Sequence, residues 1–429
     1  MSKGLCSGTV PTLFFCLVMI VTCQNGLAGE INADLQQRVT DLENELRELK
    51  EAIGREPAIA PGRLPVWSTL DVQFSGYMKL DASYDSTDMN TGNFATWAES
   101  EAGNRNDNMF NMTANQTRLR LVLKGPEVAG AQSSGKVETD FYGTGAGENR
   151  PGILVRHAFM KLDWPDSNCS LIAGQTSDIA SPLVPETLNY TVFWNVGNIG
   201  YRRPQLRITK DVAISQGSRL KLEGAAFRSI GRAAAGLMAT DDTGEDAGYP
   251  GGAARVSVAI RRPGGKDFVV GVSGHIAGEE AGNSSKHYKS RFVGLDMAAP
   301  INKALSLKGE IFKGQNLNQY FGGIGQGVNA ATREEIKTWG GWVGLNIKPG
   351  SLPQWRFNIN AGLEDVDNGD LSVAVPAQRK YNRAISANAI RSFGKHLEVG
   401  LEVTDWLTKY KGASSGDGYR VQTSLVYKF

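Results

Sequence analysis

The feature that most constrains this chain is a period-two pattern of apolar and polar residues from residue 70 to the last residue. In "RLRLVLK" (118–124) three leucines share one face of an extended chain, and Arg118, Arg120 and Lys124 share the other. Sixteen segments of this kind predict β-strands. They are 70–85, 115–125, 135–143, 153–164, 169–175, 204–210, 218–228, 254–262, 267–277, 290–299, 304–314, 337–348, 354–365, 381–392, 396–407 and 418–429.

The connections between these segments alternate in length. Gaps after even-numbered segments are short, such as "RPGG" and "FGK", although the first of them, "PEVAGAQSS", is looser. Gaps after odd-numbered segments are longer, and four are long: 86–114, 176–203, 229–253 and 315–336. Short turns on one rim and long loops on the other are typical of antiparallel outer-membrane barrels, with the turns facing the periplasm. An even strand number places both ends of the barrel on the turn side.

The alternating faces indicate which side of this barrel contacts lipid. Sixteen strands enclose a wide lumen, and the chain has too few large apolar residues to fill it. Charged side chains therefore point inward and apolar side chains outward. We expect an all-β fold, a transmembrane antiparallel β-barrel of about sixteen strands over 70–429, in the bacterial outer membrane.

The N-terminus has the pattern of a signal peptide, 1–28. A positive charge at Lys3 precedes the apolar run Leu13–Cys23, and small residues allow cleavage after Ala28. The run is short for a membrane anchor. A lipoprotein cut before Cys23 is a second possibility. Three of the four cysteines lie in this leader, so the mature chain keeps Cys169 and forms no internal disulfide.

Residues 29–56 show a heptad pattern. The apolar steps alternate between four and three, and the flanking charges are complementary between parallel chains, which favours a short periplasmic coiled coil over an amphipathic helix packed on its own domain. The Pro- and Gly-containing stretch 57–69 is a linker to the barrel. The predicted seam is Leu35, Val39, Leu42, Leu46, Leu49 and Ile53.

Charge and motif content exclude several classes of function. The formal net charge is +2 and no basic run occurs, which argues against a nucleic-acid partner. The four histidines form no metal-binding pattern, and no serine nucleophile motif is present. The glycines of "GGIGQG" (322–327) lack the lysine of a phosphate loop and indicate flexibility. We therefore expect neither an enzyme nor a cofactor or metal site.

The loop 176–203 is unusually apolar for an exposed connection, with Leu183, Val184, Phe193 and Trp194. We expect it to fold into the lumen and constrict it; packing on a neighbouring subunit is the alternative, and a flexible surface loop fits the composition poorly. Arginines on inward faces bind carboxylates and phosphates well and favour anions in a pore. Some of them could instead be structural partners of lumen acids. The candidate pore-lining residues are Arg118, Arg120, Arg156, Arg207, Arg219, Lys221, Arg356, Asp178 and Glu186.

The last segment ends "LVYKF". Phe429 and Tyr427 fall on its lipid-facing side, and this strand must pair with the first one, around "FSGYMKLD" (74–81), to close the barrel. A terminal aromatic also resembles the signal read by the outer-membrane barrel-assembly machinery. We expect Phe429 and Tyr427 to act as that assembly signal.

Several segments, including "GYMKLDASYD", "NQTRLRLVLKG", "RHAFMKLDW" and "LIAGQTSDIASPLVPETLNY", resemble the DcaP-like porins of Gram-negative outer membranes. The resemblance spans most of the chain and is densest over 70–210. It implies a homotrimer with one pore per barrel, a periplasmic coiled coil, and passive ion and solute transport of small anions such as dicarboxylates. One departure is Ser177-Asp178, where the family pattern has an aromatic residue. A weakly selective general porin and a structural outer-membrane tether remain the alternatives.

Overall fold

The computed structural model describes residues 71–104, 107–143, 151–230, 247–262, 265–280, 286–373 and 378–429, and Arg38, residues 40–45 and Arg47 near the N-terminus. The chain divides into two units, 1–65 and 66–429. In the first unit, residues 40–45 are helical and Leu42 is exposed. The signal peptide, the linker and the other five seam positions lie outside the described residues. No helix among the described residues is long and apolar enough to cross a membrane.

The second unit is one antiparallel sheet of seventeen strands. Its strands are β1 (Asp71–Asp85), β2 (Met109–Thr113), β3 (Arg118–Val128), β4 (Ala131–Asp140), β5 (Leu154–Trp164), β6 (Cys169–Ser177), β7 (Arg202–Ser215), β8 (Ser218–Phe227), β9 (Gly251–Ile260), β10 (Phe268–Glu280), β11 (His287–Pro300), β12 (Leu305–Gln315), β13 (Lys337–Ile347), β14 (Trp355–Val366), β15 (Gln378–Phe393), β16 (Leu397–Lys411) and β17 (Gly416–Lys428). The described parts of the loops contain four short helical segments: α3 (Glu101–Asn104), η3 (Asn318–Tyr320), η4 (Gly323–Gly325) and η5 (Asn368–Asp370).

The sheet closes on itself, as predicted. The first and last strands pair antiparallel over Tyr77–Asp85 and Arg420–Lys428. β2 and β3 both pair with β1, one beside each half of it, so together they fill one position and the barrel wall has sixteen. The predicted segment 115–125 corresponds to the continuous strand β3, whereas β2 was not predicted and lies in the predicted loop 86–114. Closure pairs the backbone groups of every strand, which a membrane requires.

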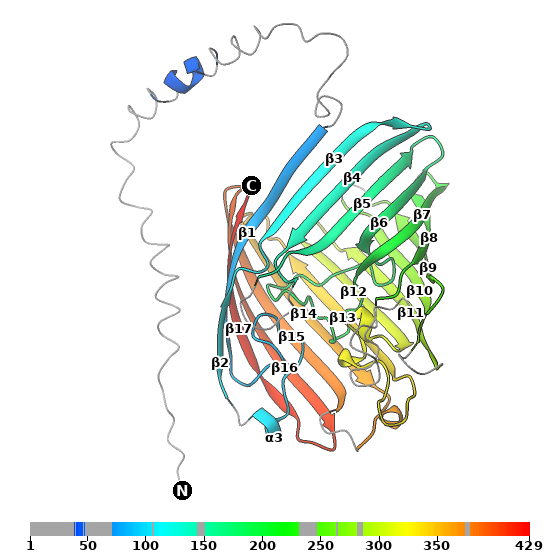
Figure 1. Ribbon diagram of the computed structural model, residues 1–429. Coiled ribbons are helices and arrows are strands. Elements are labelled where there is room, and N and C mark those ends of the chain that lie inside the picture. Colours follow the sequence, from blue (N-terminus) through cyan, green and yellow to red (C-terminus); the bar gives the residue numbers. More distant parts are fainter. Residues whose placement is uncertain are drawn as a thin grey trace. The chain divides into compact units, whose positions relative to one another are not determined.

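Turns and loops are sorted between the two rims, as the gap lengths predicted. Figure 1 shows the hairpin of β3 and β4 on the same rim as the C-terminus and the long loops on the other. One detail was wrong: the gap 126–134 is not loose. β3 runs to Val128 and β4 starts at Ala131, so the turn has two residues, Ala129 and Gly130. Both have a positive φ, of 50° and 73°, which matches the twist of a tight hairpin.

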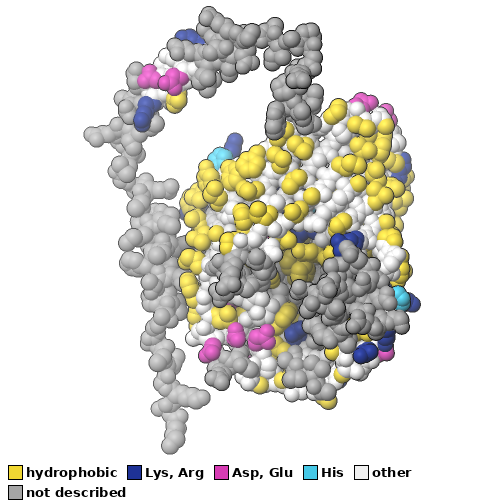
Figure 2. Space-filling model, viewed as in Figure 1, with side chains coloured by type: hydrophobic (Ala, Val, Ile, Leu, Met, Phe, Trp, Pro, Cys, Tyr) yellow, Lys and Arg dark blue, Asp and Glu magenta, His cyan; other side chains and the backbone are white. Residues whose placement is uncertain are grey.

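The barrel is apolar outside and charged inside. On β1, Met78 and Leu80 are 59% and 43% exposed, whereas Lys79 and Asp81 between them are each only 6% exposed. Figure 2 shows apolar side chains spread over the outer wall. A soluble barrel has the opposite arrangement, and this one is typical of a wall that contacts lipid.

Most of the buried apolar residues lie within the barrel, between inward-folded loops and the wall. One cluster joins Phe193 and Val196 of the loop after β6 to Trp342 and Trp406 of the wall. A second cluster joins Ile199 to Phe292, Phe312 and Tyr320. The loops thus reduce the open lumen and determine where solvent and solutes can pass.

Candidate functional site

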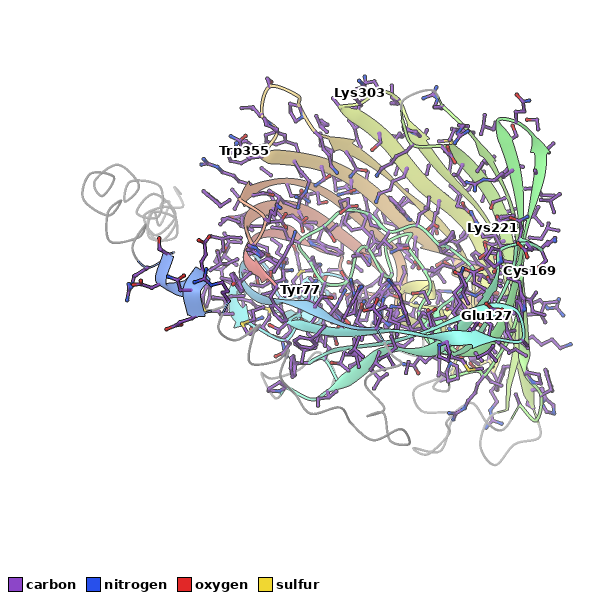
Figure 3. The ribbon with its side chains drawn as sticks, turned by 90° about the horizontal axis from the view of Figure 1, so that it is seen from above. Tyr77, Glu127, Cys169, Lys221, Lys303 and Trp355 are labelled. Carbon is purple, nitrogen blue, oxygen red and sulfur yellow. The ribbon has the colours of Figure 1, made fainter. Side chains whose placement is uncertain are left out.

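The segment between β6 and β7, residues 178–201, lies inside the ring of strands in the view along the barrel (Figure 3). Three glutamates of the wall hold its backbone. Glu310 of β12 accepts a hydrogen bond from the Leu183 N–H at 2.8 Å, and Glu402 of β16 accepts one from the Leu188 N–H at 2.8 Å. Glu364 of β14 accepts one from the Gly197 N–H at 3.3 Å. Together, these buried carboxylates accept backbone N–H groups and fix the loop to three alternate strands of the wall, β12, β14 and β16.

Glycines permit this close approach. At Gly362 of β14, a Cβ atom would lie 2.2 Å from the Val196 carbonyl oxygen of the loop. Gly197 has a φ of +98°, and a Cβ there would lie 2.1 Å from the Gly341 carbonyl oxygen of β13. Both positions therefore require glycine, one for space and the other for space and backbone conformation.

A second loop, 316–336, supports the first from the other side. The Asn195 N–H donates to the Phe321 carbonyl at 2.8 Å, and the Gly200 N–H donates to the Tyr320 carbonyl at 2.7 Å. The rings of Trp194 and Phe321 stack with their centroids 4.2 Å apart. The two loops form one unit, which positions the aromatic residues beside the cavity described next.

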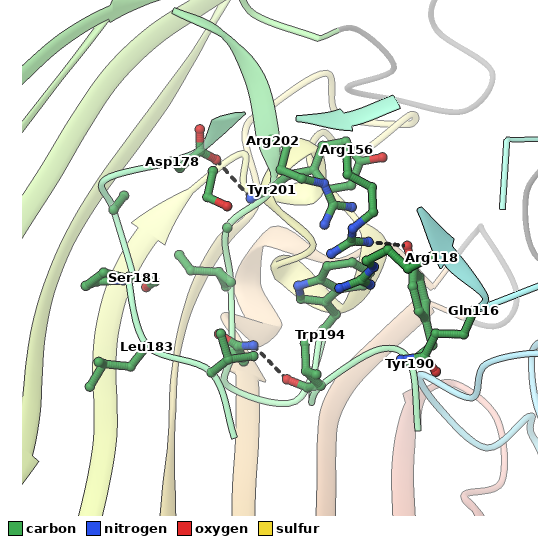
Figure 4. A pocket seen from close by; sticks show the side chains of 18 of the residues that line it. Gln116, Arg118, Arg156, Asp178, Ser181, Leu183, Tyr190, Trp194, Tyr201 and Arg202 are labelled. Atoms are coloured by element: carbon green, nitrogen blue, oxygen red, sulfur yellow. Dashed lines mark hydrogen bonds between the residues drawn. The ribbon is translucent and has the colours of Figure 1, made fainter. Parts of the chain in front are cut away.

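A cavity of about 470 Å³ lies between the 178–201 loop and the wall formed by β3, β5 and β7. Its basic residues are Arg118, Arg156, Arg202 and Arg207, and the one acidic residue in its described lining is Asp178. Figure 4 shows the side chains of Arg118, Arg156 and Arg202 converging beside Trp194. Guanidinium groups gathered in one cavity favour an anion between them.

These arginines are only partly neutralised by the protein. Arg156 donates to Asp140 at 2.7 Å and to Glu138 at 3.1 Å, while the Arg118 guanidinium lies 3.7 Å from both carboxylates. Arg118 Nε and Arg202 Nη2 are buried and have no hydrogen-bond acceptor among the described residues. Arg202 lies over the ring of Tyr201 at 4.7 Å instead of beside a carboxylate. Arg118 and Arg202 thus make no short ion pair with a carboxylate of the described chain, and they leave positive charge beside the cavity.

Tyr190 of the loop links the cavity to its counter-ions. Its hydroxyl donates to Asp140 at 3.1 Å and accepts from Arg156 at 3.0 Å. Burial raises the pKa of Tyr190 to about 12 because the phenolate loses its hydration. The phenol thus remains a neutral donor at physiological pH.

Asp178, the departure from the family pattern, has a structural partner. Its carboxylate accepts from Arg203 Nε at 2.7 Å and from the Tyr201 N–H at 2.9 Å. Arg203 was absent from the predicted residues. Asp178 is therefore neutralised by Arg203, which does not line the cavity, rather than by one of the four arginines that do.

The predicted pore-lining residues do not form one cluster. Arg118, Arg156, Arg207 and Asp178 line the arginine cavity. Arg120 is paired with Glu138 at 2.8 Å, so the interpretation of some arginines as structural partners holds for this residue. Arg219 and Lys221 lie near the turn end of β8, and Arg219 is paired with Asp267 at 3.4 Å. Arg356 pairs with Glu398 at 2.7 Å, and Glu186 with Lys308 at 3.0 Å.

Sequence reasoning missed Arg202. It follows Tyr201 in "YRRP", which the sequence analysis placed in the loop 176–203 rather than in a strand. β7 begins at Arg202, two residues earlier than predicted, and this start turns Arg202 toward the cavity. Two adjacent arginines at a loop-to-strand junction were the available signal.

No protein-family model matches the sequence, and no curated protein matches it. Several solved structures, however, match the chain in fold. The outer membrane channel DcaP of Acinetobacter baumannii is 18% identical, with a TM-score of 0.68, over 85% of this chain and 99% of that one. The chain has a porin fold. The porin fold also relates it to an anion-selective porin from Comamonas acidovorans, 14% identical with a TM-score of 0.51 over 84% of this chain and 100% of that one. A structure of OmpT of Vibrio cholerae, described as its trimer form, is 10% identical with a TM-score of 0.50 over 84% of this chain and 100% of that one. The predicted resemblance to DcaP-like porins is confirmed at the level of the fold.

Proposed function

We propose that the chain is an outer-membrane porin for passive diffusion of small anionic solutes, in particular carboxylates. The observation that carries this proposal is the arginine cavity: four arginines line it, Arg203 already occupies the carboxylate of Asp178, and Arg202 has no carboxylate partner among the described residues. The apolar outer wall supports a location in the outer membrane. The similarity in fold to an anion-selective porin adds support for the sign of the selectivity.

The loop 178–201 is the proposed constriction. Its hydrogen bonds to Glu310, Glu364 and Glu402 keep it across the interior, and it forms one side of the arginine cavity. A solute that passes the loop beside Trp194 meets Arg118, Arg156 and Arg202. The barrel is also proposed to assemble as a homotrimer in lipid, since a porin of similar fold has a trimer form.

The test is the reversal potential of the purified protein in planar bilayers under a potassium chloride gradient. We expect anion selectivity for the natural chain and a several-fold lower anion-to-cation permeability ratio for Arg202→Gln. Lys395→Gln removes one positive charge from the exposed turn between β15 and β16 and should leave the ratio unchanged. Cation selectivity of the natural protein would contradict the proposal.

Two other functions give different results in the same experiment. A general porin would conduct with a permeability ratio close to one and would respond little to Arg202→Gln. A structural tether that acts through the predicted coiled coil would not need to conduct at all. Deletion of residues 31–53 separates the roles further, since a porin without this segment keeps its pore while a tether loses its connection.

A further inference from the structure

A second cavity, of about 530 Å³, lies at the rim of short turns, between the connections that follow β9, β11 and β13. Four basic residues line it: Arg262, Lys266, Lys303 and Lys348. Its described lining contains no acidic residue. Figure 3, which is seen from this rim, shows Lys303 at the edge of the barrel. The cavity is separate from the arginine cavity, with which it shares no residue.

Part of the lining of the rim cavity faces the lumen. Ser306 lies on the same face of β12 as the buried Glu310, and Asn346 lies on the same face of β13 as the buried Trp342. Lys266, Ser306, Asn346 and Lys348 also line a smaller cavity of about 210 Å³ on the inner wall, which includes Glu186 of the 178–201 loop. The rim cavity therefore adjoins a cavity of the inner wall that reaches the proposed constriction.

The acids of the adjoining smaller cavity are already paired. Glu186 pairs with Lys308 at 3.0 Å, and Asp267 pairs with Arg219 at 3.4 Å. By contrast, Lys303 and Lys348 make no ion pair with any carboxylate in the part of the chain that the structure describes. Lys303 and Lys348 therefore bring to the rim cavity positive charge that no described carboxylate offsets.

The frame of the rim cavity is fixed by hydrogen bonds. Asn302 Oδ1 accepts from the Ala304 and Leu305 N–H groups at 2.8 and 2.9 Å. The Lys348 N–H donates to the Ala304 carbonyl at 2.7 Å, which ties the ends of two neighbouring turns together. Asn346 Nδ2 donates to Asn358 at 2.7 Å. The backbone beneath Lys303 and Lys348 is thus ordered, and their ammonium groups can adjust to a bound anion.

We propose that the rim cavity is a second binding site for small oxyanions, carboxylate or phosphate, at the short-turn mouth of the channel. It goes beyond the proposed function, which needs the arginine cavity alone. Ammonium groups on flexible stems bind oxyanions as point charges, more weakly than the guanidinium forks of the arginine cavity. Weak binding suits a mouth, because a solute must be attracted and also leave.

The test measures inorganic phosphate binding to the full, folded chain in zwitterionic detergent micelles, by the broadening of the phosphate ³¹P resonance. Three proteins are compared with the natural chain: Lys303→Gln/Lys348→Gln, Arg202→Gln, and the control Lys313→Gln/Lys395→Gln, which removes two exposed charges outside both cavities. We expect two classes of bound phosphate. The rim variant should weaken one class on the order of tenfold, Arg202→Gln should weaken the other, and the control should weaken neither.

Several results would overturn the rim site. Phosphate binding by Lys303→Gln/Lys348→Gln equal to that of the natural chain would do so. The same holds if the rim variant keeps phosphate binding but loses association with phosphatidylglycerol added to the micelles, because the lysines would then contact lipid headgroups. Failure of the proposed function is distinct, since it appears as a reversal potential without anion selectivity while the phosphate titration of the rim site is unaffected.

Discussion

Asp178 and Arg203 form a two-point ion pair inside the barrel: Arg203 Nε lies 2.7 Å from Asp178 Oδ1 and Nη2 lies 3.1 Å from Oδ2. Arg203 is fully buried, and its guanidinium also lies 3.9 Å over the ring of Tyr320. The pair therefore joins the start of β7, the loop 178–201 and the loop 316–336 at one point. Its role is structural, whereas Arg202 beside it faces the cavity.

Asp178→Asn should destabilise the barrel interior. The substitution leaves Arg203 buried without a counter-charge, at a cost of about 3–5 kcal/mol in the free energy of unfolding. Urea unfolding in detergent micelles measures this change. Asp405→Asn breaks an exposed pair with Arg383 and should cost less than about 1 kcal/mol. Equal losses for the two variants would contradict the structural role of Asp178.

Glu402→Ala should loosen the proposed constriction. The variant removes the acceptor for the Leu188 and Asn189 N–H groups, which lie 2.8 and 3.2 Å from the carboxylate. Single-channel recordings should show larger current fluctuations than the natural protein. Glu334→Ala, at an exposed position paired with Lys286, serves as the control. Quiet recordings from Glu402→Ala would mean that the other contacts suffice to hold the loop.

Gly362→Ala should displace the loop through a steric clash. Its Cβ would lie 2.2 Å from the Val196 carbonyl oxygen, so either the loop or β14 must shift. We expect a changed single-channel conductance and a loss of about 1–3 kcal/mol in stability. Gly350→Ala is the matched control because a Cβ there meets nothing within 4 Å. If the conductance of Gly362→Ala equals that of the natural protein, the loop does not contact the wall in the membrane.

Tyr190→Phe should change the alkaline stability profile. Burial raises the pKa of Tyr190 to about 12, above its ordinary value of 10.0, so the neutral phenol is favoured in the folded protein. Stability from this shift is fully present below pH 10 and falls as the pH rises through 12, by up to about 3 kcal/mol. Unfolding curves across this range should decline less steeply for Tyr190→Phe. If the stability of the natural protein and that of Tyr190→Phe decline equally with pH, Tyr190 is accessible to water.

Phe429→Ala should impair barrel assembly, if Phe429 and Tyr427 form the proposed assembly signal. Phe429 also packs on Phe74 of β1, with ring centroids 5.7 Å apart, so closure and signalling must be separated. Phe74→Ala removes the same contact and keeps the last residue, and Phe110→Ala removes an exposed phenylalanine elsewhere. Folded protein in isolated outer membranes is the measurement. A loss confined to Phe429→Ala supports a signal; equal losses for Phe74→Ala indicate packing alone.

The period-two pattern by itself determined the barrel, because each side chain of a strand faces either lipid or lumen and the residue type records which. It located sixteen of the seventeen strands, the pairing of the first strand with the last, and the rim that carries the turns, but it placed β2 in the predicted loop 86–114. The interruption between β2 and β3 and the two-residue turn at Ala129–Gly130 were not visible, since local alternation does not specify where pairing breaks.

The tertiary structure decided which charges are available. The period-two pattern placed four arginines on inward faces: Arg118, Arg120, Arg156 and Arg207. It could not assign ion-pair partners that are far apart in the sequence. Arg120 is paired with Glu138, while Arg202, hidden in a presumed loop, has a buried guanidinium nitrogen without an acceptor among the described residues. Asp178 meets Arg203 only after the loop has folded across the lumen. Such pairings depend on distances across the barrel, which a one-dimensional pattern does not contain.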